Sequence, residues 1–353
     1  MQGLDDVVAA DTVLSEVDGK AGRLIIRGRS LDELAGRARF EDVTRLLWEG
    51  FVDPLPDDLG SALGEARREV FAKFGDTNQL PPYDAMRALT AHLADGADLP
   101  TALRLLAAPS VFTAAALRRR AGLAPVAPDP SLGHAADTLR MLSGETPSPE
   151  RAAALDAYLV TVSDHGLNAS TFAARVIAST GAGLVSSALG GLSALKGPLH
   201  GGAPGPVNAM LDEIATPDNA RPWLEAALAR GDRLMGFGHR IYRVRDPRAD
   251  ALKAATLRLG GEAGGRFALA EAVEAAALAV LKERKPSRPL DVNVEFYTAL
   301  LLEAVGFPPD AFTCVFAMAR MAGWIAHARE QALTGRLIRP MSRYLGPGPR
   351  QAA

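Results

Sequence analysis

Apolar residues recur three and four positions apart along nearly the whole chain, and this spacing constrains the fold more than any other feature of the sequence. The clearest stripe comprises Leu155, Tyr158, Leu159 and Val162. It follows Ser148 and Pro149, a side chain suited to cap a helix and a proline suited to its first position. Only residues 23–27 have the character of a β-strand. Because strands do not alternate with helices, the sequence predicts an all-α fold and disfavours a doubly wound α/β sheet.

Cap and stop signals predict further helices and the connections between them. Ser30 and Glu33 have the spacing of a capping box, and an apolar face that includes Val43, Leu46 and Leu47 ends at Gly50. Helices rich in Ala and Leu are also expected over residues 268–281 and 295–330. Loops rich in proline or glycine are expected over residues 124–130, 197–206 and 260–265.

A stretch without charged residues lies between Arg175 and Lys196. Its length is close to the roughly 20 residues that span a bilayer. Its composition is as rich in Ser, Thr, Gly and Ala as in Val, Ile and Leu, which makes it a poor membrane segment. We therefore expect a helix buried inside a large helical protein.

Length and charge exclude several classes of protein. A chain of 353 residues suits one large domain or two domains that share a cleft. Its formal net charge of −2 argues against nucleic-acid binding through bulk positive charge. The single cysteine, Cys314, excludes an intramolecular disulfide framework and a Cys-rich metal site. With an acidic N-terminus that lacks the pattern of a secretion signal, this indicates a reducing, cytoplasmic location.

Three of the six histidines have surroundings that are typical of a functional site. His200 and His239 lie beside glycines, which let a backbone approach a ligand closely, and His165 lies at a break between two predicted helices. The other three, His92, His134 and His327, lack such surroundings and are expected to be structural.

Arginines concentrate around His239, in residues 230–248. Guanidinium groups beside glycines and a histidine favour recognition of phosphate or carboxylate, although a solvated basic face would give the same pattern. No P-loop, HExxH or GxSxG motif is present in the sequence, and residues 236–238 lack the third glycine of a dinucleotide fingerprint. The spacing of the three histidines gives no shared helix face for zinc, so no metal site is expected.

Taken together, these segments resemble the citrate synthase family over essentially the whole chain. The resemblance rests on six segments in the expected order, besides the start of the chain. They are Asp164-His165 with Asn168-Ala-Ser, Gly197-Pro-Leu-His200-Gly-Gly, Met235-Gly-Phe-Gly-His239-Arg with Asp246-Pro-Arg248, Asn293-Val-Glu295-Phe-Tyr, Ala319-Arg320-Met-Ala-Gly-Trp-Ile-Ala-His327 and Ile338-Arg339-Pro340.

The resemblance implies a condensation of acetyl-CoA with oxaloacetate, followed by hydrolysis of the citryl thioester to citrate and CoA. In that reaction Glu295 would be the base, His200 the donor to the thioester carbonyl, and His239 the group that polarises the ketone. The substrate carboxylates would be bound by a second set of residues. It comprises His165, Arg248, Arg320, Arg339 of the partner subunit, and the segment that holds Asn168.

Coenzyme A is implied as a co-substrate, and neither a metal nor a permanently bound cofactor is implied. Arg243 would contact a CoA phosphate, and the loop that contains Leu234, Gly236 and Gly238 would meet the adenine. The resemblance also implies a homodimer of the short bacterial or archaeal type. A large helical domain of residues 1–200 and 301–353 would bind oxaloacetate and form the dimer, and a smaller helical domain of residues 201–300 would bind CoA and close over the cleft.

Two positions depart from the family pattern. Glu295 stands where the best-known members have Asp, which adds one methylene to the base, and the nearest aspartate, Asp291, is four residues away. Pro204 stands where Asn is common.

Three other functions remain open from the sequence. A 2-methylcitrate synthase would differ only in accepting propionyl-CoA. A non-catalytic paralogue that binds CoA or a carboxylate finds its support in the departure at Glu295. A metal-dependent hydrolase rests on the histidines alone.

Overall fold

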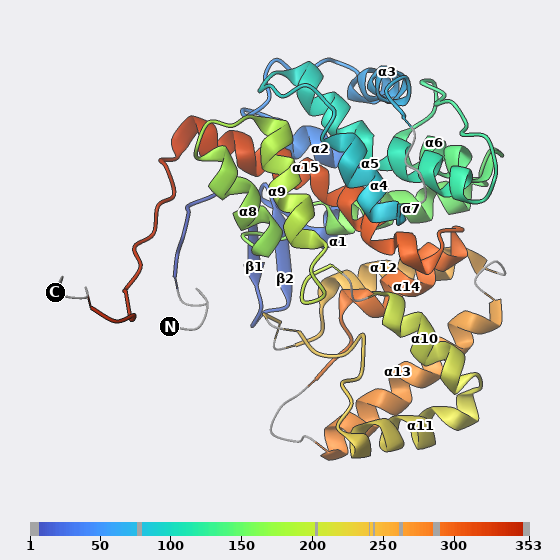
Figure 1. The fold of residues 1–353 in the computed structure, drawn as a ribbon. Helices are drawn as coiled ribbons and strands as arrows, with labels where there is room; N and C mark the ends of the chain where they lie inside the picture. The colour runs from blue at the N-terminus through green and yellow to red at the C-terminus, as the bar shows by residue number, and fades with distance from the viewer. Residues whose placement is uncertain are drawn as a thin grey trace.

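The computed structural model describes residues 7–75, 80–201, 204–239, 241–242, 244–260, 264–284 and 290–348. Helices dominate this part of the chain, as Figure 1 shows, which confirms the predicted all-α fold. The first nine helices are α1 (Leu31–Leu34), α2 (Phe40–Trp48), α3 (Leu59–Phe71), α4 (Pro82–Thr90), α5 (Leu99–Arg120), α6 (His134–Ser143), α7 (Pro149–Val162), α8 (Ala169–Ala178) and α9 (Leu184–Leu195). They are followed by α10 (Pro204–Ile214), α11 (Pro217–Arg230), α12 (Pro247–Arg258), α13 (Gly264–Arg284), α14 (Val294–Ala304), the 3₁₀ helix η2 (Pro309–Ala311) and α15 (Phe312–Thr334).

A small antiparallel sheet near the N-terminus is the exception to the helical pattern. Its strands β1 (Ser15–Asp18), β2 (Arg23–Ile26) and β3 (Arg29–Ser30) lie in sequence order. The prediction of a strand over residues 23–27 is confirmed by β2. The sequence analysis missed β1, because Ser-Glu-Val-Asp is short and mostly polar and becomes a strand only by pairing Val17 with Leu24.

The predicted helix starts are confirmed, with one difference in length. Glu33 completes the capping box at Ser30, and Ser148 Oγ accepts the N–H of Arg151 at the start of α7. The helix that begins after Ser30 ends at Leu34, however, and the apolar face around Val43 belongs to the separate helix α2.

The uncharged stretch between Arg175 and Lys196 forms two helices, so the prediction of one buried helix was wrong. The chain leaves α8 and turns through Gly181 and Gly183, whose φ angles of +79° and +95° favour glycine. Asp95 then accepts the N–H of Val185 at 2.8 Å and caps the start of α9. The predicted 295–330 region is likewise divided, into α14, η2 and α15.

The upper part of the molecule in Figure 1, the upper body, contains helix α15 in its middle. Helix α15 packs there against α5, α7, α8 and α9. Two segments, Leu99–Arg120 and Pro309–Thr334, are long and apolar enough to cross a membrane. Their apolar windows are 83% and 89% buried inside the fold, as expected for core helices.

Helices α9 and α15 can approach each other closely because residue 191 is a glycine. A Cβ at Gly191 of α9 would lie 2.8 Å from the Trp324 ring on α15.

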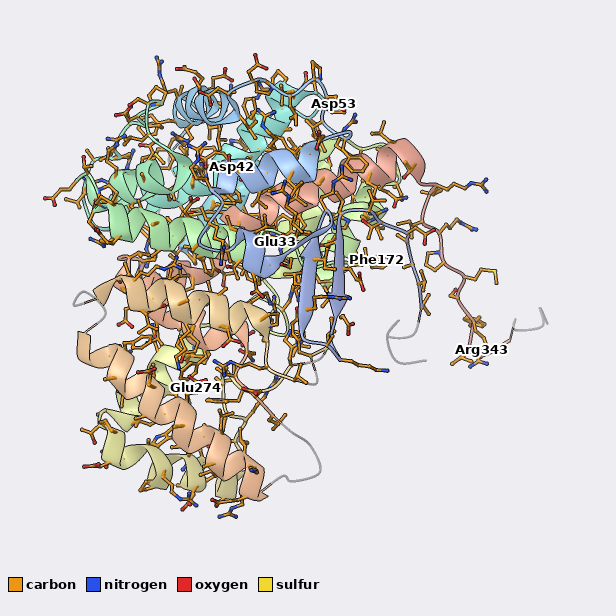
Figure 2. The ribbon with its side chains drawn as sticks, turned by 180° about the vertical axis from the view of Figure 1, so that it is seen from behind. Glu33, Asp42, Asp53, Phe172, Glu274 and Arg343 are labelled. Carbon is orange, nitrogen blue, oxygen red and sulfur yellow. The ribbon has the colours of Figure 1, made fainter. Side chains whose placement is uncertain are left out.

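Helices α10, α11 and α13 form the lower part of the molecule, and α12 and α14 lie between them and the upper body (Figure 1). The segment after α15 extends away from the rest of the chain, and Arg343 on it lies well outside the body in Figure 2. Leu337, Met341, Tyr344 and Leu345 on this segment are exposed.

Candidate active site

Three aromatic side chains meet at one place, one from the turn after α7 and two from the segment before α12. His165 follows α7, and its ring centroid lies 5.9 Å from that of His239. Tyr242 contacts both rings, with its hydroxyl 3.2 Å from His165 Nε2 and its centroid 4.8 Å from that of His239. The structure therefore brings together two of the predicted histidines. It adds Tyr242, which the sequence analysis missed.

The backbone fixes the tautomer of His239. Its Nδ1 accepts the N–H groups of Ile241 and Tyr242, both at 3.0 Å, so the proton of the neutral ring lies on Nε2. Burial, followed by the positive charge of Arg248, lowers the pKa of His239 to about 4. Nε2 also lies 3.1 Å from Arg248 Nη2, which can only donate, so with this tautomer the two donors face each other without a hydrogen bond between them. A ligand oxygen that accepts from both groups would relieve this contact.

Arg248 lies in the first turn of α12 and is held by the residue that caps this helix. Asp246 Oδ1 accepts the backbone N–H and the Nε–H of Arg248, both at 3.0 Å, and Oδ2 accepts from Nη2 at 2.8 Å. Burial alone would raise the pKa of Asp246, but the charge and hydrogen bonds of Arg248 outweigh it and hold the pKa below its ordinary value. The Asp-Pro pair, typical of a helix start, is the sequence signal for this role.

Arg320 is a second buried guanidinium, on α15, and is 1% exposed. Its Nε donates to the Val162 carbonyl at 2.9 Å, and its guanidinium lies 4.8 Å from the Phe316 ring centroid. Among the residues that the structure describes, no hydrogen-bond acceptor is placed on its other N–H groups. Burial lowers its pKa to about 10, and the charges of Arg320 and Arg248 add to burial in holding the pKa of His165 well below its usual range. An anionic ligand would compensate both cations.

His200, between α9 and α10, is held by Ser170, which the sequence analysis did not single out. Its Nε2 lies 2.8 Å from Ser170 Oγ, and Trp324 Nε1 donates to the same hydroxyl at 3.2 Å. Burial, followed by the charge of Arg320, lowers the pKa of His200 to about 4, so the ring is neutral near pH 7.

Asn168 fixes the Ser170 hydroxyl. Its Oδ1 accepts the hydroxyl proton of Ser170 at 2.8 Å, together with the backbone N–H groups of Ser170 and Thr171, as the cap of α8. Ser170 Oγ in turn lies 2.8 Å from His200 Nε2, so this cap and Trp324 hold the ring in place. Asn168, predicted to bind substrate, has its amide bonded within the protein, with Nδ2 3.3 Å from the Gly166 carbonyl.

Glu295 lies in the first turn of α14, and a short network fixes this turn to the loop that precedes His239. Asn293 caps the helix by accepting the N–H of Glu295 at 3.0 Å. It also donates from its backbone to Gly236 O at 2.9 Å and from its side chain to Gly238 O at 2.8 Å. A Cβ at Gly236 would lie 2.8 Å from the Phe296 side chain, which explains the glycine there.

The electrostatics of Glu295 suit a base at neutral pH. Burial raises its pKa to about 7, and the nearby charges of Arg248 and Arg233 oppose this rise without cancelling it. Asp291, the alternative aspartate, instead pairs with Arg245 at 3.3 Å and accepts the N–H of Val292. Glu295 is therefore the carboxyl group available to this site.

The remaining predicted residues lie in different places. Leu234 is buried beneath the loop that contains Gly236 and Gly238. Arg243 lies outside the described residues. Arg339 is exposed on the C-terminal segment, where the N–H of its neighbour Ile338 donates to Ser179 Oγ at the end of α8. The structure thus does not bring Arg339 to the other site residues of its own chain. Within the described part of the chain, no group of three His, Cys, Asp or Glu side chains could hold a metal ion.

An all-α fold with a carboxyl group, three neutral imidazoles and two buried guanidiniums around one site defines an enzyme that binds an anionic substrate and performs acid–base chemistry. The family described as "Citrate synthase, C-terminal domain" matches residues 3–341. The chain belongs to the citrate synthase family, whose members are transferases that form a C–C bond.

Three relatives illustrate the range of this family. "Putative citrate synthase 2" of Mycobacterium tuberculosis is 41% identical, covering 99% of this chain and 93% of that protein. "2-methylcitrate synthase" of the same organism is 37% identical, covering 98% and 90%. A solved citrate synthase from the archaeon Thermoplasma acidophilum, in a ternary complex with carboxymethyl coenzyme A and oxaloacetate, superimposes with a TM-score of 0.85. It is 29% identical, covering 100% of this chain and 97% of that one.

Proposed function

We propose that the protein is a citrate synthase that condenses acetyl-CoA with oxaloacetate and water to give citrate and CoA. The observation that carries this proposal is the pair of buried cations, Arg248 and Arg320, whose donors lie beside the neutral His165 and His239. Two guanidiniums in one site suit a dicarboxylate. The archaeal relative, which holds both a CoA analogue and oxaloacetate, supports the same assignment.

The first step is removal of a proton from the methyl group of acetyl-CoA. The carboxylate of Glu295 takes this proton, and Nδ1–H of His200 donates to the thioester oxygen on which negative charge develops. A neutral imidazole is a suitable donor because its proton returns when the enol reacts. Ser170 and Trp324 hold the ring in place for this step.

The second step forms the C–C bond. The enol carbon attacks the ketone carbon of oxaloacetate, while Nε2–H of His239 and the Arg248 guanidinium donate to its oxygens. Arg320 and His165 bind the carboxylates. Water then cleaves the citryl thioester, which releases citrate and the CoA thiol.

The CoA moiety contacts the segment that precedes His239. Leu234, Gly236 and Gly238 would face the adenine, and Arg243 a phosphate. Neither a metal nor a permanently bound cofactor takes part in these steps. Residues 201–300 would form the smaller domain and close over residues 1–200 and 301–353, so that His200 lies at the junction where closure excludes water.

We further propose a cytoplasmic homodimer in which Arg339 completes the site of the partner subunit. Two observations support this: Arg339 lies apart from the other site residues of its own chain, and its segment exposes Leu337 and Met341. An extended segment with exposed apolar side chains needs a surface to cover it.

Subunit mixing tests the shared site. Glu295→Gln and Arg339→Ala homodimers are each expected to be nearly inactive, whereas an equimolar mixture, reassembled after dissociation, regains about a quarter of wild-type activity. The gain arises because each mixed dimer contains one site with both residues intact. A mixture as inactive as its components, although mixed dimers are present, would place Arg339 in the site of its own chain.

Oxaloacetate-dependent release of free CoA thiol tests the function itself, with acetyl-CoA and propionyl-CoA assayed in parallel. We expect acetyl-CoA to have the higher kcat/KM. Because one methylene changes discrimination by only about 1–3 kcal/mol, a preference for propionyl-CoA would identify the alternative, a 2-methylcitrate synthase. Binding of oxaloacetate without thiol release from either thioester would identify a non-catalytic paralogue.

The pH dependence of kcat/KM for acetyl-CoA follows from the pKa of Glu295. The base acts as a carboxylate, so activity should fall as the pH drops through about 7 and reach a plateau above it. His200 and His239, with pKa values of about 4, stay neutral throughout this range. Steady-state assays from pH 5.5 to 9 measure the profile, and activity that is flat down to pH 5.5 would contradict it.

A further inference from the structure

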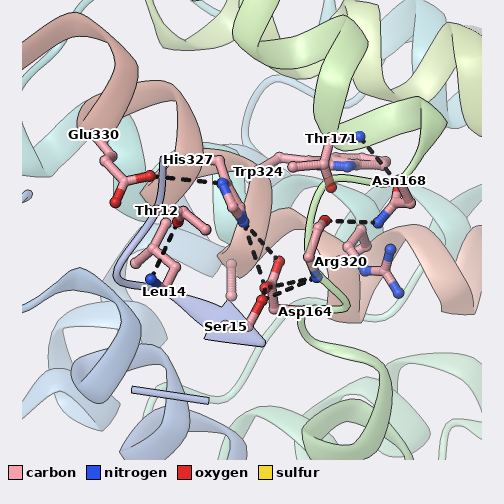
Figure 3. A network of polar contacts seen from close by, with 12 residues as sticks. Thr12, Leu14, Ser15, Asp164, Asn168, Thr171, Arg320, Trp324, His327 and Glu330 are labelled. Atoms are coloured by element: carbon pink, nitrogen blue, oxygen red, sulfur yellow. Dashed lines mark hydrogen bonds and ion pairs between the residues drawn. The ribbon is translucent and has the colours of Figure 1, made fainter. Parts of the chain in front are cut away.

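Asp164 is fully buried next to His165 and forms hydrogen bonds around it (Figure 3). Its Oδ2 accepts the Ser15 hydroxyl and, at 3.3 Å, the N–H of Gly166. Ser15 Oγ accepts the same Gly166 N–H at 2.9 Å. The carboxylate thus links the residue before His165 to the residue after it, which fixes the turn that presents the imidazole.

His327 of α15 approaches this carboxylate in a tautomer that its other neighbour determines. Its Nδ1 lies 3.0 Å from Arg175 Nη1, and a guanidinium can only donate, so Nδ1 accepts. The proton of the neutral ring is then on Nε2, which donates to Asp164 Oδ2 at 3.4 Å and lies 3.2 Å from Oδ1. Arg175 itself is fixed by Glu330 at 2.5 Å and by Gln331 at 3.0 Å.

Each carboxylate of this network faces a cation. Arg175 pairs with Glu330, and the Arg320 charge acts on Asp164. Burial alone would raise the pKa of Asp164, but His327, Arg320 and the Ser15 hydroxyl outweigh it and hold the pKa below its ordinary value, so the group is ionised. A buried carboxylate of this kind depends on every donor that it has.

The fold brings α15 close enough for this contact. A Cβ at Gly323 would lie 2.6 Å from Asp164 Oδ1 and 2.6 Å from the Ser163 carbonyl, so this glycine allows the helix to reach the turn. The N-terminal segment covers the other side. Val13 donates its N–H to Glu330 at 2.9 Å, which places Ser15 against Asp164.

We propose that Asp164 and His327 are positioning residues, and that the neutral His327 holds the Asp164 carboxylate, which in turn holds His165 in place for a carboxylate of the keto-acid substrate. Neither residue touches the substrate. The inference rests on the proposed function, because it assigns a ligand to His165. It gives a role to His327, which the sequence analysis expected to be structural.

The test compares His327→Leu with His327→Gln. Leucine has a similar volume but no donor, whereas the glutamine amide can still donate to Asp164. We expect His327→Leu to raise KM for oxaloacetate roughly tenfold to a hundredfold, the effect of losing a hydrogen bond to a charged group, with KM for acetyl-CoA changed less than about twofold. His327→Gln should stay within about threefold of wild type for both substrates.

A matched control is His134→Leu, the same substitution at another fully buried histidine of the upper body. Neither ring nitrogen of His134 has a hydrogen-bond partner in the described structure, and the ring stacks on Phe40. We expect its KM values to equal those of wild type even if its melting temperature changes. Equal changes in KM for oxaloacetate at His134→Leu and His327→Leu would overturn the proposal, as would an unchanged KM in His327→Leu.

Ser15→Ala keeps the proposal testable if His327→Leu fails to fold. It removes the hydroxyl shared by Asp164 and Gly166 from a partly exposed position, and we expect KM for oxaloacetate to rise about threefold to tenfold. An unchanged KM in that case would overturn the proposal. The wild-type protein tests the proposed function separately, and that function is refuted if wild type releases no thiol. If wild type is active and the variants have the wild-type KM for oxaloacetate, only the positioning role is refuted.

Discussion

Replacement of Glu295 by glutamine is expected to lower kcat by roughly 10²–10⁴-fold, because it removes the carboxylate proposed as the base, whereas Asp246, the other carboxylate near His239, is paired with Arg248. The amide has the same shape and cannot take the methyl proton. KM for oxaloacetate should stay within about twofold, since Arg248, Arg320 and His165 are unchanged. Thiol release under saturating substrates measures the effect.

Two further variants test whether the loss of kcat is specific to the carboxylate at position 295. Glu303→Gln changes a glutamate on the same helix that is exposed and pairs with Arg266, and it should keep full activity. Glu295→Asp keeps the charge but withdraws the oxygens by one methylene, and we expect roughly a hundredfold loss of kcat because misplacement of the base by about 1 Å can cost that much. Turnover of Glu295→Gln equal to that of Glu303→Gln would remove Glu295 from the base role.

Replacement of His200 by alanine is expected to lower kcat by roughly 10²–10³-fold, the effect of losing one donor to a developing oxyanion. The loss should appear in kcat with acetyl-CoA and leave KM for oxaloacetate nearly unchanged. Ser170→Ala should have a smaller effect in the same direction, because the ring remains but is no longer held by the hydroxyl 2.8 Å away.

His92→Ala provides the control, since His92 is an exposed histidine that follows α4. It should behave as wild type. If His200→Ala instead raised KM for oxaloacetate and kept kcat, His200 would be a residue that binds the keto acid, and the donor to the thioester would have to be another group.

Local signals predicted those parts of the fold that depend on neighbouring residues. The capping box at Ser30 and the Ser148-Pro149 pair specify where helices begin, because cap and helix lie in one short segment. The break between α8 and α9 was missed because Asp95, which caps α9, comes from a distant segment. Strand β1 was missed for the same reason, since its partner is β2 rather than its own sequence pattern.

Only part of the candidate site could be predicted from the sequence, for a similar reason. Glycine neighbours pointed to His200 and His239, and the family resemblance pointed to Glu295 and the arginines. The partners that hold the rings could not be predicted, because most come from other elements: Ser170 and Trp324 for His200, and the backbone after His239 for its own ring. His327 closes a segment that resembles the family, but its role could not be predicted, since its polar contacts are with Arg175 and Asp164 on other parts of the chain.

The close contact at Gly323 has a consequence for how such a protein can vary over evolutionary time. A methyl group at this position would lie 2.6 Å from an Asp164 oxygen and 2.6 Å from the Ser163 carbonyl, so a larger residue cannot fit here even where Asp164 is replaced. Residue 323 is therefore constrained by the backbone of the turn as well as by the aspartate side chain. Sequence drift in α15 is in this way tied to a turn that lies far away along the chain.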